Sequence, residues 1–176
     1  MALKPTIYKC RIDLSDLNRD RYDTLNLTLA QHPSETTERM MVRLLAFCLN
    51  AQDNLVFSKD LSSPEEPDLW VHSLDGNLET WIDVGEPAPE RIKKASRVAR
   101  TVKVYSFNSK ADTWWAQNKQ ALQQGNAEFF QFDWESVQGL ARLVERTMDW
   151  SVTLSEQSVY VSTAAGDCEV TWQVLS

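Results

Sequence analysis

Residues 67–94 read PDLWVHSLDGNLETWIDVGEPAPERIKK, and the rest of the chain is arranged around them. They contain two apolar runs joined by Asp75 and Gly76, and Asp-Gly between such runs is the strongest short-range signal for a β-hairpin. After the second run, Gly-Glu-Pro ends the strand and Pro89 suits the first turn of a helix. These residues therefore predict strand, turn, strand and helix in succession.

The register of this hairpin brings two carboxylates together. If Asp75 and Gly76 are the two turn residues, Asp68 lies opposite Asp83 on the same face of the sheet. Residues directly opposite one another have Cβ atoms roughly 5 Å apart, which suits a shared divalent metal ion. A second interpretation stays open, in which one Asp caps a turn and the other makes an ordinary hydrogen bond at a strand end.

The length and composition predict one globular domain, residues 1–176. The chain is 43% hydrophobic and contains seven Trp, so it can bury a core without disulfides. The three cysteines lack metal-ligand spacing and are typical of reduced thiols. The sequence has neither the apolar core of a signal peptide nor a run of about 18 apolar residues. We therefore expect a cytoplasmic protein with no membrane partner.

The net charge argues against some functions and leaves others open. At −7, with a sequence pI near 4.9, the protein repels nucleic acid on average, which argues against a simple DNA-coating role. The two histidines, His32 and His72, lie far apart in sequence and argue against a His-based zinc site or a Ser/His/Asp triad. Residues 91–103 contain six basic and no acidic side chains, namely Arg91, Lys93, Lys94, Arg97, Arg100 and Lys103. This cluster keeps nucleic acid as a candidate partner, although a solvated helix face is the default interpretation of such charges.

Apolar periodicity predicts the remaining elements. Alternation predicts an antiparallel pair of strands near residues 6–14 and 24–29, and further strands close the chain. Between them we expect a helix that starts at Pro33-Ser34 with Ser34 as its N-cap, a strand over 55–61, the hairpin, a helix from Pro89, a strand over 101–107, a helix over 110–122, a strand over 129–132 and a helix over 134–146. The strand-helix-strand order predicts a parallel portion of the sheet. The aromatic residues follow the periodicity of these elements, which favours a packed core over a base-stacking surface.

Glu38 lies on the inward side of the first predicted helix, one turn before the apolar stripe that begins at Met41. An inward carboxylate costs free energy unless it is paired or bound to a metal ion. Two interpretations stay open. Glu38 contributes to a site, or it reaches solvent near the helix start or pairs with Arg39 or Arg43.

The cations of the predicted helix from Pro89 point in different directions around its axis. At 100° per residue, its buried face consists of Ile92, Ala95, Val98 and Ala99. Lys93 and Arg97 point nearly opposite, whereas Arg91 and Lys94 lie at the borders of the buried face. A border lysine such as Lys94 is able to reach over the edge of the sheet.

The predicted order, together with Pro67-Asp68 and Asp83 fifteen residues after Asp68, resembles the core of the PD-(D/E)XK nuclease superfamily. More closely, TERMMVRLLAF, PDLW, ETWIDVGEPAPERIKKAS and VKVYSF resemble the YaeQ family of small bacterial proteins, over most of the chain. The resemblance implies an α/β (α+β) fold. It has a central mixed β-sheet flanked by helices, a restriction-endonuclease-like core, and additional N- and C-terminal antiparallel strands.

The resemblance also implies a set of metal ligands for Mg²⁺ or Mn²⁺. Asp68 and Asp83 match the metal-binding acids, and Glu38 matches the helix acid that many superfamily members add. The carbonyl of Val84 is a further candidate ligand. All ligands are oxygens, which these hard cations prefer.

The lysine of the superfamily motif does not match. It belongs two residues after the second acid, where this sequence has Gly85. Some superfamily members supply the lysine from the following helix, so Lys94 becomes the candidate, with Lys93 and Arg91 behind it.

Two functions from different classes follow. The first is metal-dependent hydrolysis of nucleic-acid phosphodiesters, in which the metal activates a water molecule and Lys94 orients that water or offsets phosphate charge. Arg91, Lys93, Arg97 and Arg100 would then neutralise neighbouring phosphates. The alternative is a nuclease-like fold without catalysis that serves as a binding or regulatory module for nucleic acid or protein.

Overall fold

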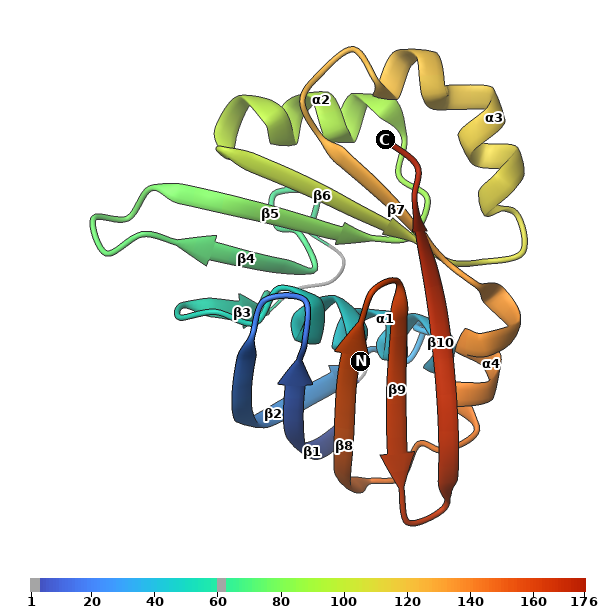
Figure 1. Cartoon of the computed structure of the whole chain (residues 1–176). Coiled ribbons are helices and arrows are strands. Elements are labelled where there is room, and N and C mark those ends of the chain that lie inside the picture. The colour runs from blue at the N-terminus through green and yellow to red at the C-terminus, as the bar shows by residue number, and fades with distance from the viewer. Residues whose placement is uncertain (1–3, 60–62) are drawn as a thin grey trace. The chain divides into compact units, whose positions relative to one another are not determined.

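The computed structural model describes residues 4–59 and 63–176, and its chain forms two compact units. Residues 1–49 and 133–172 belong to the first unit, and residues 50–132 and 173–176 belong to the second. Each unit combines helices with a mixed β-sheet, which gives the described chain a mixed α+β fold (Figure 1). Neither unit is a continuous piece of sequence. No helix in these described ranges is long and apolar enough to cross a membrane.

The sheet of the first unit joins the two ends of the sequence. Its strand order is β2-β1-β8-β9-β10, with β1 parallel to β8 and the other neighbours antiparallel. The strands are β1 (Thr6–Asp16), β2 (Arg21–Gln31), β8 (Thr147–Ser155), β9 (Ser158–Thr163) and β10 (Gly166–Val174). The predicted opening pair is confirmed and extends over eleven residues of each strand.

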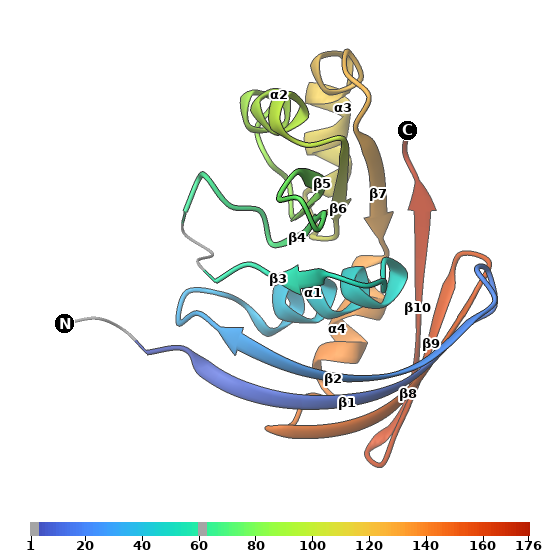
Figure 2. The ribbon, with the colours of Figure 1, turned by 90° about the vertical axis from the view of Figure 1, so that its left-hand side faces the viewer.

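Two helices, α1 (Thr37–Leu49) and α4 (Trp134–Ala141), pack on each other in the first unit (Figure 2). The prediction that Ser34 caps α1 is wrong, because the helix starts later and the hydroxyl of Thr36 accepts the backbone N–H of Arg39. The prediction for α4 is too long at its C-terminus. The chain leaves the helix at Ala141 and enters β8 at Thr147, which allows β8 to pair with β1.

The sheet of the second unit has the order β7-β6-β5-β4-β3. Its strands are β3 (Leu55–Phe57), β4 (Leu69–His72), β5 (Leu78–Val84), β6 (Thr101–Ser106) and β7 (Glu128–Phe132). The predicted parallel portion is confirmed for β5, β6 and β7, whereas β3, β4 and β5 are antiparallel. The strand predicted over 55–61 ends at Phe57, and residues 60 and 61 lie outside the described residues.

The hairpin between β4 and β5 keeps the predicted register through a different turn. Trp70 lies opposite Trp81, as predicted, but a bulge places His72 opposite Leu78. The turn is longer than Asp75-Gly76, because the backbone N–H of Ser73 already donates to the carbonyl of Asn77. The longer turn shifts the register by one residue and the bulge shifts it back.

Two helices, α2 (Pro89–Val98) and α3 (Ala111–Leu122), belong to the second unit and contribute to its core. This core includes Trp81, Ile92, Ala95, Val102, Val104, Leu122 and Phe129. The prediction that Val98 is buried is wrong, since 59% of it is exposed. The helix ends at Val98, and Ala99 in extended conformation takes the buried position.

Candidate functional site

The two predicted acids lie side by side in the second unit. The backbone N–H of Asp68 donates to the carbonyl of Ile82 at 3.0 Å, and its Oδ2 accepts the backbone N–H of Val84 at 2.7 Å. Asp68 is therefore tied to β5 on both sides of Asp83. Both acids are almost fully buried, at 5% and 2% exposure. Such burial is costly for carboxylates, so each one needs compensating donors.

The pKa of Asp83 is raised, and burial is the main cause. The hydrogen bond and the charge of Arg91 lower this pKa, the charge of Asp68 raises it, and the indole N–H of Trp81 lowers it. That indole N–H still lacks a hydrogen bond of good geometry. Arg91 is therefore the main group that offsets the cost of burying the Asp83 carboxylate.

Arg91 is the cation that meets Asp83. Its Nε donates to Oδ2 at 2.8 Å and its Nη2 donates to Oδ1 at 3.2 Å, so the pair is bidentate. The same guanidinium donates to the carbonyls of Pro64 at 3.2 Å and Glu66 at 2.9 Å. It also lies over the ring of Trp81, 5.3 Å from the centroid. Arg91 thus joins the first turn of α2, strand β5 and the loop before β4.

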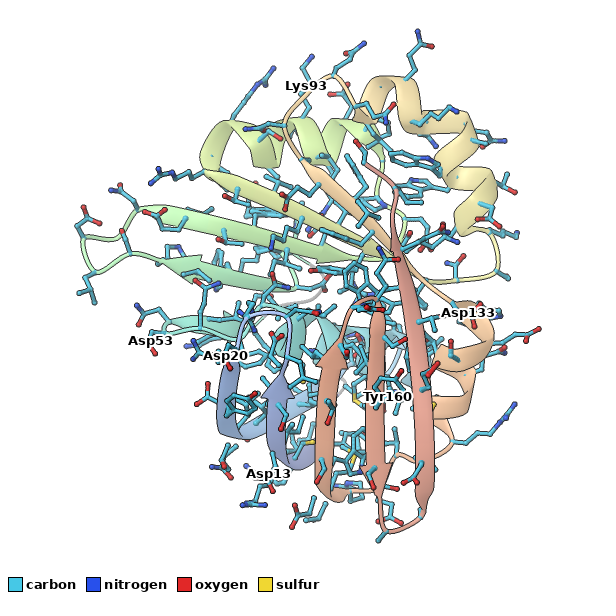
Figure 3. All side chains as sticks on the ribbon, in the orientation of Figure 1. Asp13, Asp20, Asp53, Lys93, Asp133 and Tyr160 are labelled. Carbon is cyan, nitrogen blue, oxygen red and sulfur yellow. The ribbon has the colours of Figure 1, made fainter. Side chains whose placement is uncertain are left out.

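The other predicted cations are exposed and lie on α2 or directly after it. Lys93 points away from the sheet in Figure 3. Lys94, Arg97 and Arg100 are exposed as well. Lys94 lines a groove of about 650 Å³ together with Arg91 and with Trp81 and Leu78 of β5. The catalytic role of Lys94 stays a prediction.

Gly85 stands two residues after Asp83, where the superfamily resemblance implies a lysine. Its φ is 120°, a conformation that L side chains rarely adopt, although a Cβ there would meet only open space. Its backbone N–H donates to the carbonyl of Tyr105 at 2.8 Å, which fixes the bend after β5. A lysine at this position is therefore excluded by backbone conformation rather than by lack of room.

Glu86 is a functional candidate that sequence reasoning missed. Its carboxylate accepts the backbone N–H of Phe107 at 3.0 Å and a hydrogen bond from the side chain of Asn108. It thereby connects the carboxyl ends of the parallel strands β5 and β6, a common place for ligands in such sheets. The sequence signal for Glu86 was its place in Gly-Glu-Pro, directly after a buried strand. An acid close to the core needs a hydrogen-bonding partner.

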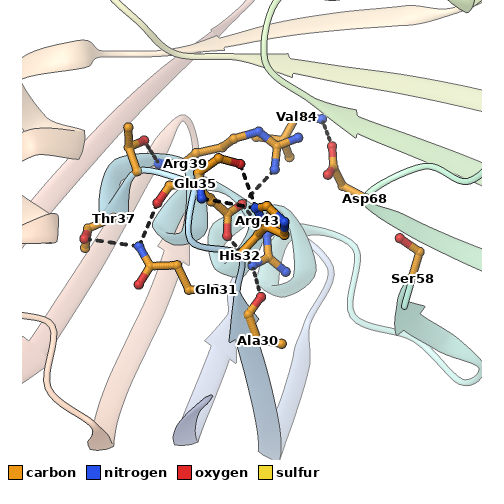
Figure 4. A network of polar contacts seen from close by, with 12 residues as sticks. Ala30, Gln31, His32, Glu35, Thr37, Arg39, Arg43, Ser58, Asp68 and Val84 are labelled. Carbon is orange, nitrogen blue, oxygen red and sulfur yellow. Dashed lines mark hydrogen bonds and ion pairs between the residues drawn. The ribbon is translucent and has the colours of Figure 1, made fainter. Parts of the chain in front are cut away.

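Glu38 lies in the first unit, in the first turn of α1, and is half-buried there. The arginines proposed as its partners bind Glu35 instead. Arg43 donates to Glu35 from Nε at 2.9 Å and from Nη2 at 2.7 Å, and Arg39 donates at 2.7 Å (Figure 4). The spacing of Glu35, Arg39 and Arg43, four residues each, was a signal for this network. The role of Glu38 as a metal ligand stays a prediction.

The described residues contain no group of three or more His, Cys, Asp or Glu side chains placed to hold a metal ion. Asp68 and Asp83 form a pair of oxygen ligands of the type that Mg²⁺ prefers. Both oxygens of Asp83, however, accept hydrogen bonds from Arg91. Each of these oxygens has a second lone pair, but the positive charge of Arg91 beside them opposes the binding of a metal ion at this pair.

Comparison with known proteins gives a consistent result along the whole chain. The family model described as YaeQ protein matches residues 1–172. An uncharacterized YaeQ protein of Salmonella typhi is 38% identical over 98% of both chains, and its counterpart from Escherichia coli K12 is 37% identical over the same shares. The crystal structure of a YaeQ protein from Xanthomonas axonopodis pv. citri is 36% identical and covers 98% of both chains, with a TM-score of 0.93. That of a Pseudomonas syringae YaeQ protein is 35% identical and covers 98% of this chain and 96% of its own, with a TM-score of 0.92. The chain therefore belongs to the YaeQ family.

Proposed function

We propose that this protein binds nucleic acid without hydrolysing it, on a nuclease-like core in which Arg91 takes the place of a metal ion. The observation that supports this proposal is the bidentate ion pair between Arg91 and Asp83. The guanidinium is also held by two backbone carbonyls, so its displacement would break at least four hydrogen bonds. A site that is neutralised from within the chain needs no cation from solution.

The exposed cations of α2 form the binding surface in this proposal. Lys93, Lys94 and Arg97 of the helix are exposed, as is Arg100 directly after it, and Glu90 is the only acid in the helix. Lys93 and Arg97 also line a cavity of about 410 Å³ between α2 and α3. Contacts of this kind reach phosphates rather than base edges, so we expect salt-dependent binding with little sequence preference.

Fluorescence anisotropy with short labelled DNA and RNA tests this surface. The double variant Lys93→Glu/Arg97→Glu should lose affinity at least ~10-fold at about 50 mM salt, and the slope of log affinity against log salt should decrease by roughly 2. The matched control is Lys110→Glu/Lys119→Glu, which makes the same change of charge at exposed positions before and within α3. Equal losses in both double variants would show that only net charge matters and would contradict the proposal.

A second candidate is metal-dependent phosphodiester hydrolysis. It is supported by two buried acids, Asp83 in β5 and Asp68 directly before β4, and by the raised pKa of Asp83. The ligands within the second unit would be Asp68, Asp83 and the Val84 carbonyl, with Lys94 as the cation beside the water molecule. Because Arg91 occupies both oxygens of Asp83, no hydrolytic step follows from the arrangement described.

Thermal melting with and without millimolar Mn²⁺ separates the two candidates. The binding module predicts no Mn²⁺-dependent increase in melting temperature for the wild type and no cleavage of a plasmid or oligonucleotide panel. Hydrolysis predicts an increase that Asp83→Ala abolishes, because ligand binding stabilises the folded state. Arg91→Met serves as the matched variant, since it frees the carboxylates and should gain Mn²⁺ stabilisation even if the wild type shows none.

A further inference from the structure

The outer edge of β2 is a long, unprotected sheet edge. In the first unit β2 is the last strand of the sheet, and its inner edge pairs with β1 in an unbroken register over all eleven residues. Figure 2 shows it running along the length of β1. An edge strand presents backbone N–H and C=O groups that another strand is able to pair with. Of the outer β2 carbonyls, Ala30 accepts a side-chain hydrogen bond, from Arg43 at 3.0 Å.

The usual features that protect such edges are absent from β2. Proteins shorten their edge strands, interrupt them with bulges or proline, or place lysines on them. The sheet of the second unit follows this rule at one edge, because β3 has only three residues. The sequence of β2, RYDTLNLTLAQ, contains neither proline nor lysine. Its only charges, Arg21 and Asp23, lie at one end and pair with each other at 2.7 Å.

The middle of β2 is palindromic. Residues 24–28 read TLNLT in both directions. An antiparallel two-fold axis through Asn26 therefore places Thr against Thr, Leu against Leu and Asn against Asn. Threonine pairs and apolar pairs are favourable cross-strand neighbours, and no like charges meet. Leu25 and Leu27 are only half-buried, so each would gain cover from its counterpart.

We propose that two copies of this chain pair through β2, antiparallel about Asn26, and thereby join the first-unit sheets of both copies. A two-fold interface uses the same patch twice and must be self-complementary, which the palindrome provides. A second copy fits this edge better than an unrelated peptide, because only the copy supplies the matching TLNLT sequence in the opposite direction. The inference is independent of the nucleic-acid proposal, which concerns the second unit.

Sedimentation equilibrium of the full chain tests the proposal between about 5 and about 200 µM. The wild-type mass should rise from 20.2 kDa toward twice that value. Asn26→Glu should raise the dissociation constant at least ~10-fold, because two carboxylates then face each other across the axis. Within its own chain the new carboxylate lies opposite Arg11 on β1, so the fold should tolerate it.

Thr28→Glu is the matched control. It introduces the same side chain on the same face, opposite Lys9 within the chain and opposite an uncharged threonine of the second copy. Its dissociation constant should stay within about 2-fold of the wild-type value. A wild type that remains monomeric at the highest concentration, or equal weakening by both variants, would overturn the proposal.

Hydrogen exchange of the wild type provides a second measurement that needs no variant. Amide protons of residues 21–31 should exchange more slowly at the high concentration than at the low one, because pairing protects the outer edge. Exchange in β9, which has strands on both sides, should not change. Exchange of residues 21–31 that does not depend on concentration would refute the pairing.

Discussion

Asp83 and Arg91 show how one buried charge determines what the carboxylate pair can bind. The Asp83 side chain is 4% exposed, and that of Arg91 is 31% exposed, so their ion pair is largely shielded from water. Removing one partner of a buried pair leaves an uncompensated charge, which costs more than the pair contributes. The balance of charges at this point therefore controls both stability and metal access.

We predict that Arg91→Met lowers the free energy of unfolding by about 3 kcal/mol, because Asp83 then stays buried without its cation. Adding Asp83→Asn to this variant should recover part of the loss. Urea denaturation measures both effects. The control is Arg97→Met, an exposed arginine of the same helix, which should change stability by less than about 0.5 kcal/mol. Similar losses in the two single variants would show that the ion pair has no special role.

Asp83 also makes stability depend on pH. Its pKa is raised from the ordinary value of 3.8, so the folded protein holds this proton to a higher pH than the unfolded chain does. The stability that Asp83 contributes is therefore fully present below the ordinary pKa of 3.8, and it is lost as pH rises through the raised pKa of the folded state. The difference in unfolding free energy between wild type and Asp83→Asn should shift against the wild type as pH rises above the ordinary value of 3.8. Parallel pH profiles from urea titrations would contradict this.

At the scale of the elements, the two helices α2 and α4 differ in how they begin. Asp133 precedes α4, and its side chain accepts the backbone N–H of Ser136 at 3.0 Å; Figure 3 labels it. Ala88 precedes α2 in the same extended conformation but offers no side-chain acceptor. The first N–H groups of α2 therefore lack a side-chain cap.

We predict that Ala88→Ser stabilises the protein by roughly 0.5 to 1 kcal/mol, since serine caps where alanine does not. Chemical denaturation gives the magnitude. Ala88→Val is the control and should bring no gain, because valine caps no better than alanine. Asp133→Ala is the reverse test and should cost about 1 kcal/mol. A gain from valine equal to that from serine would rule out capping as the cause.

The hairpin and the end of α2 show which features of an element its own sequence predicts. The pairing of Trp70 with Trp81 followed from alternation and from the Asp-Gly signal, although the actual turn differs and a bulge corrects the register. The exposure of Val98 did not follow from its periodicity, because the helix stops at that residue. Periodicity describes the interior of an element well and its ends poorly, since ends depend on the next segment.

At the scale of the whole molecule, the reactivity of the cysteine thiols is a measure of how often the first unit unfolds. Cys10 and Cys48 are buried there, and burial raises the pKa of Cys10 to about 12 and that of Cys48 above its ordinary value. Cys168 is half-buried, and burial raises its pKa as well. The thiolate is the reactive form, so the two buried thiols should be almost inert in the folded state.

We predict that a thiol reagent at mildly alkaline pH modifies Cys168 first and that Cys10 and Cys48 react only when the first unit opens. Mass spectrometry of peptides resolves the three sites. Low concentrations of urea should accelerate Cys10 and Cys48 together, because both belong to the same compact unit. In the unfolded protein all three should react at similar rates. Rapid native labelling of Cys48 would contradict the predicted inertness.

The candidate site was only partly predictable, and Arg91 and Lys94 show the limit. Sequence periodicity placed both at the borders of the buried face of α2, but it did not choose between them, because a helix start shifted by one residue rotates every side chain by 100°. The bidentate contact from Arg91 depends on where α2 begins and on the carbonyls of Pro64 and Glu66. Lys94 instead lines the groove.

Local pattern was sufficient for most strand and helix types, because these depend on neighbours a few residues away, and the order of several short motifs was sufficient for the family resemblance. Contacts between distant segments were needed for the division into two units, for the left-handed backbone at Gly85 and for the contacts of Arg91 with Pro64 and Glu66. The physical reason is that a buried charge is compensated by whichever donor the folded chain brings within hydrogen-bond distance, and that donor can come from a helix or loop far along the sequence.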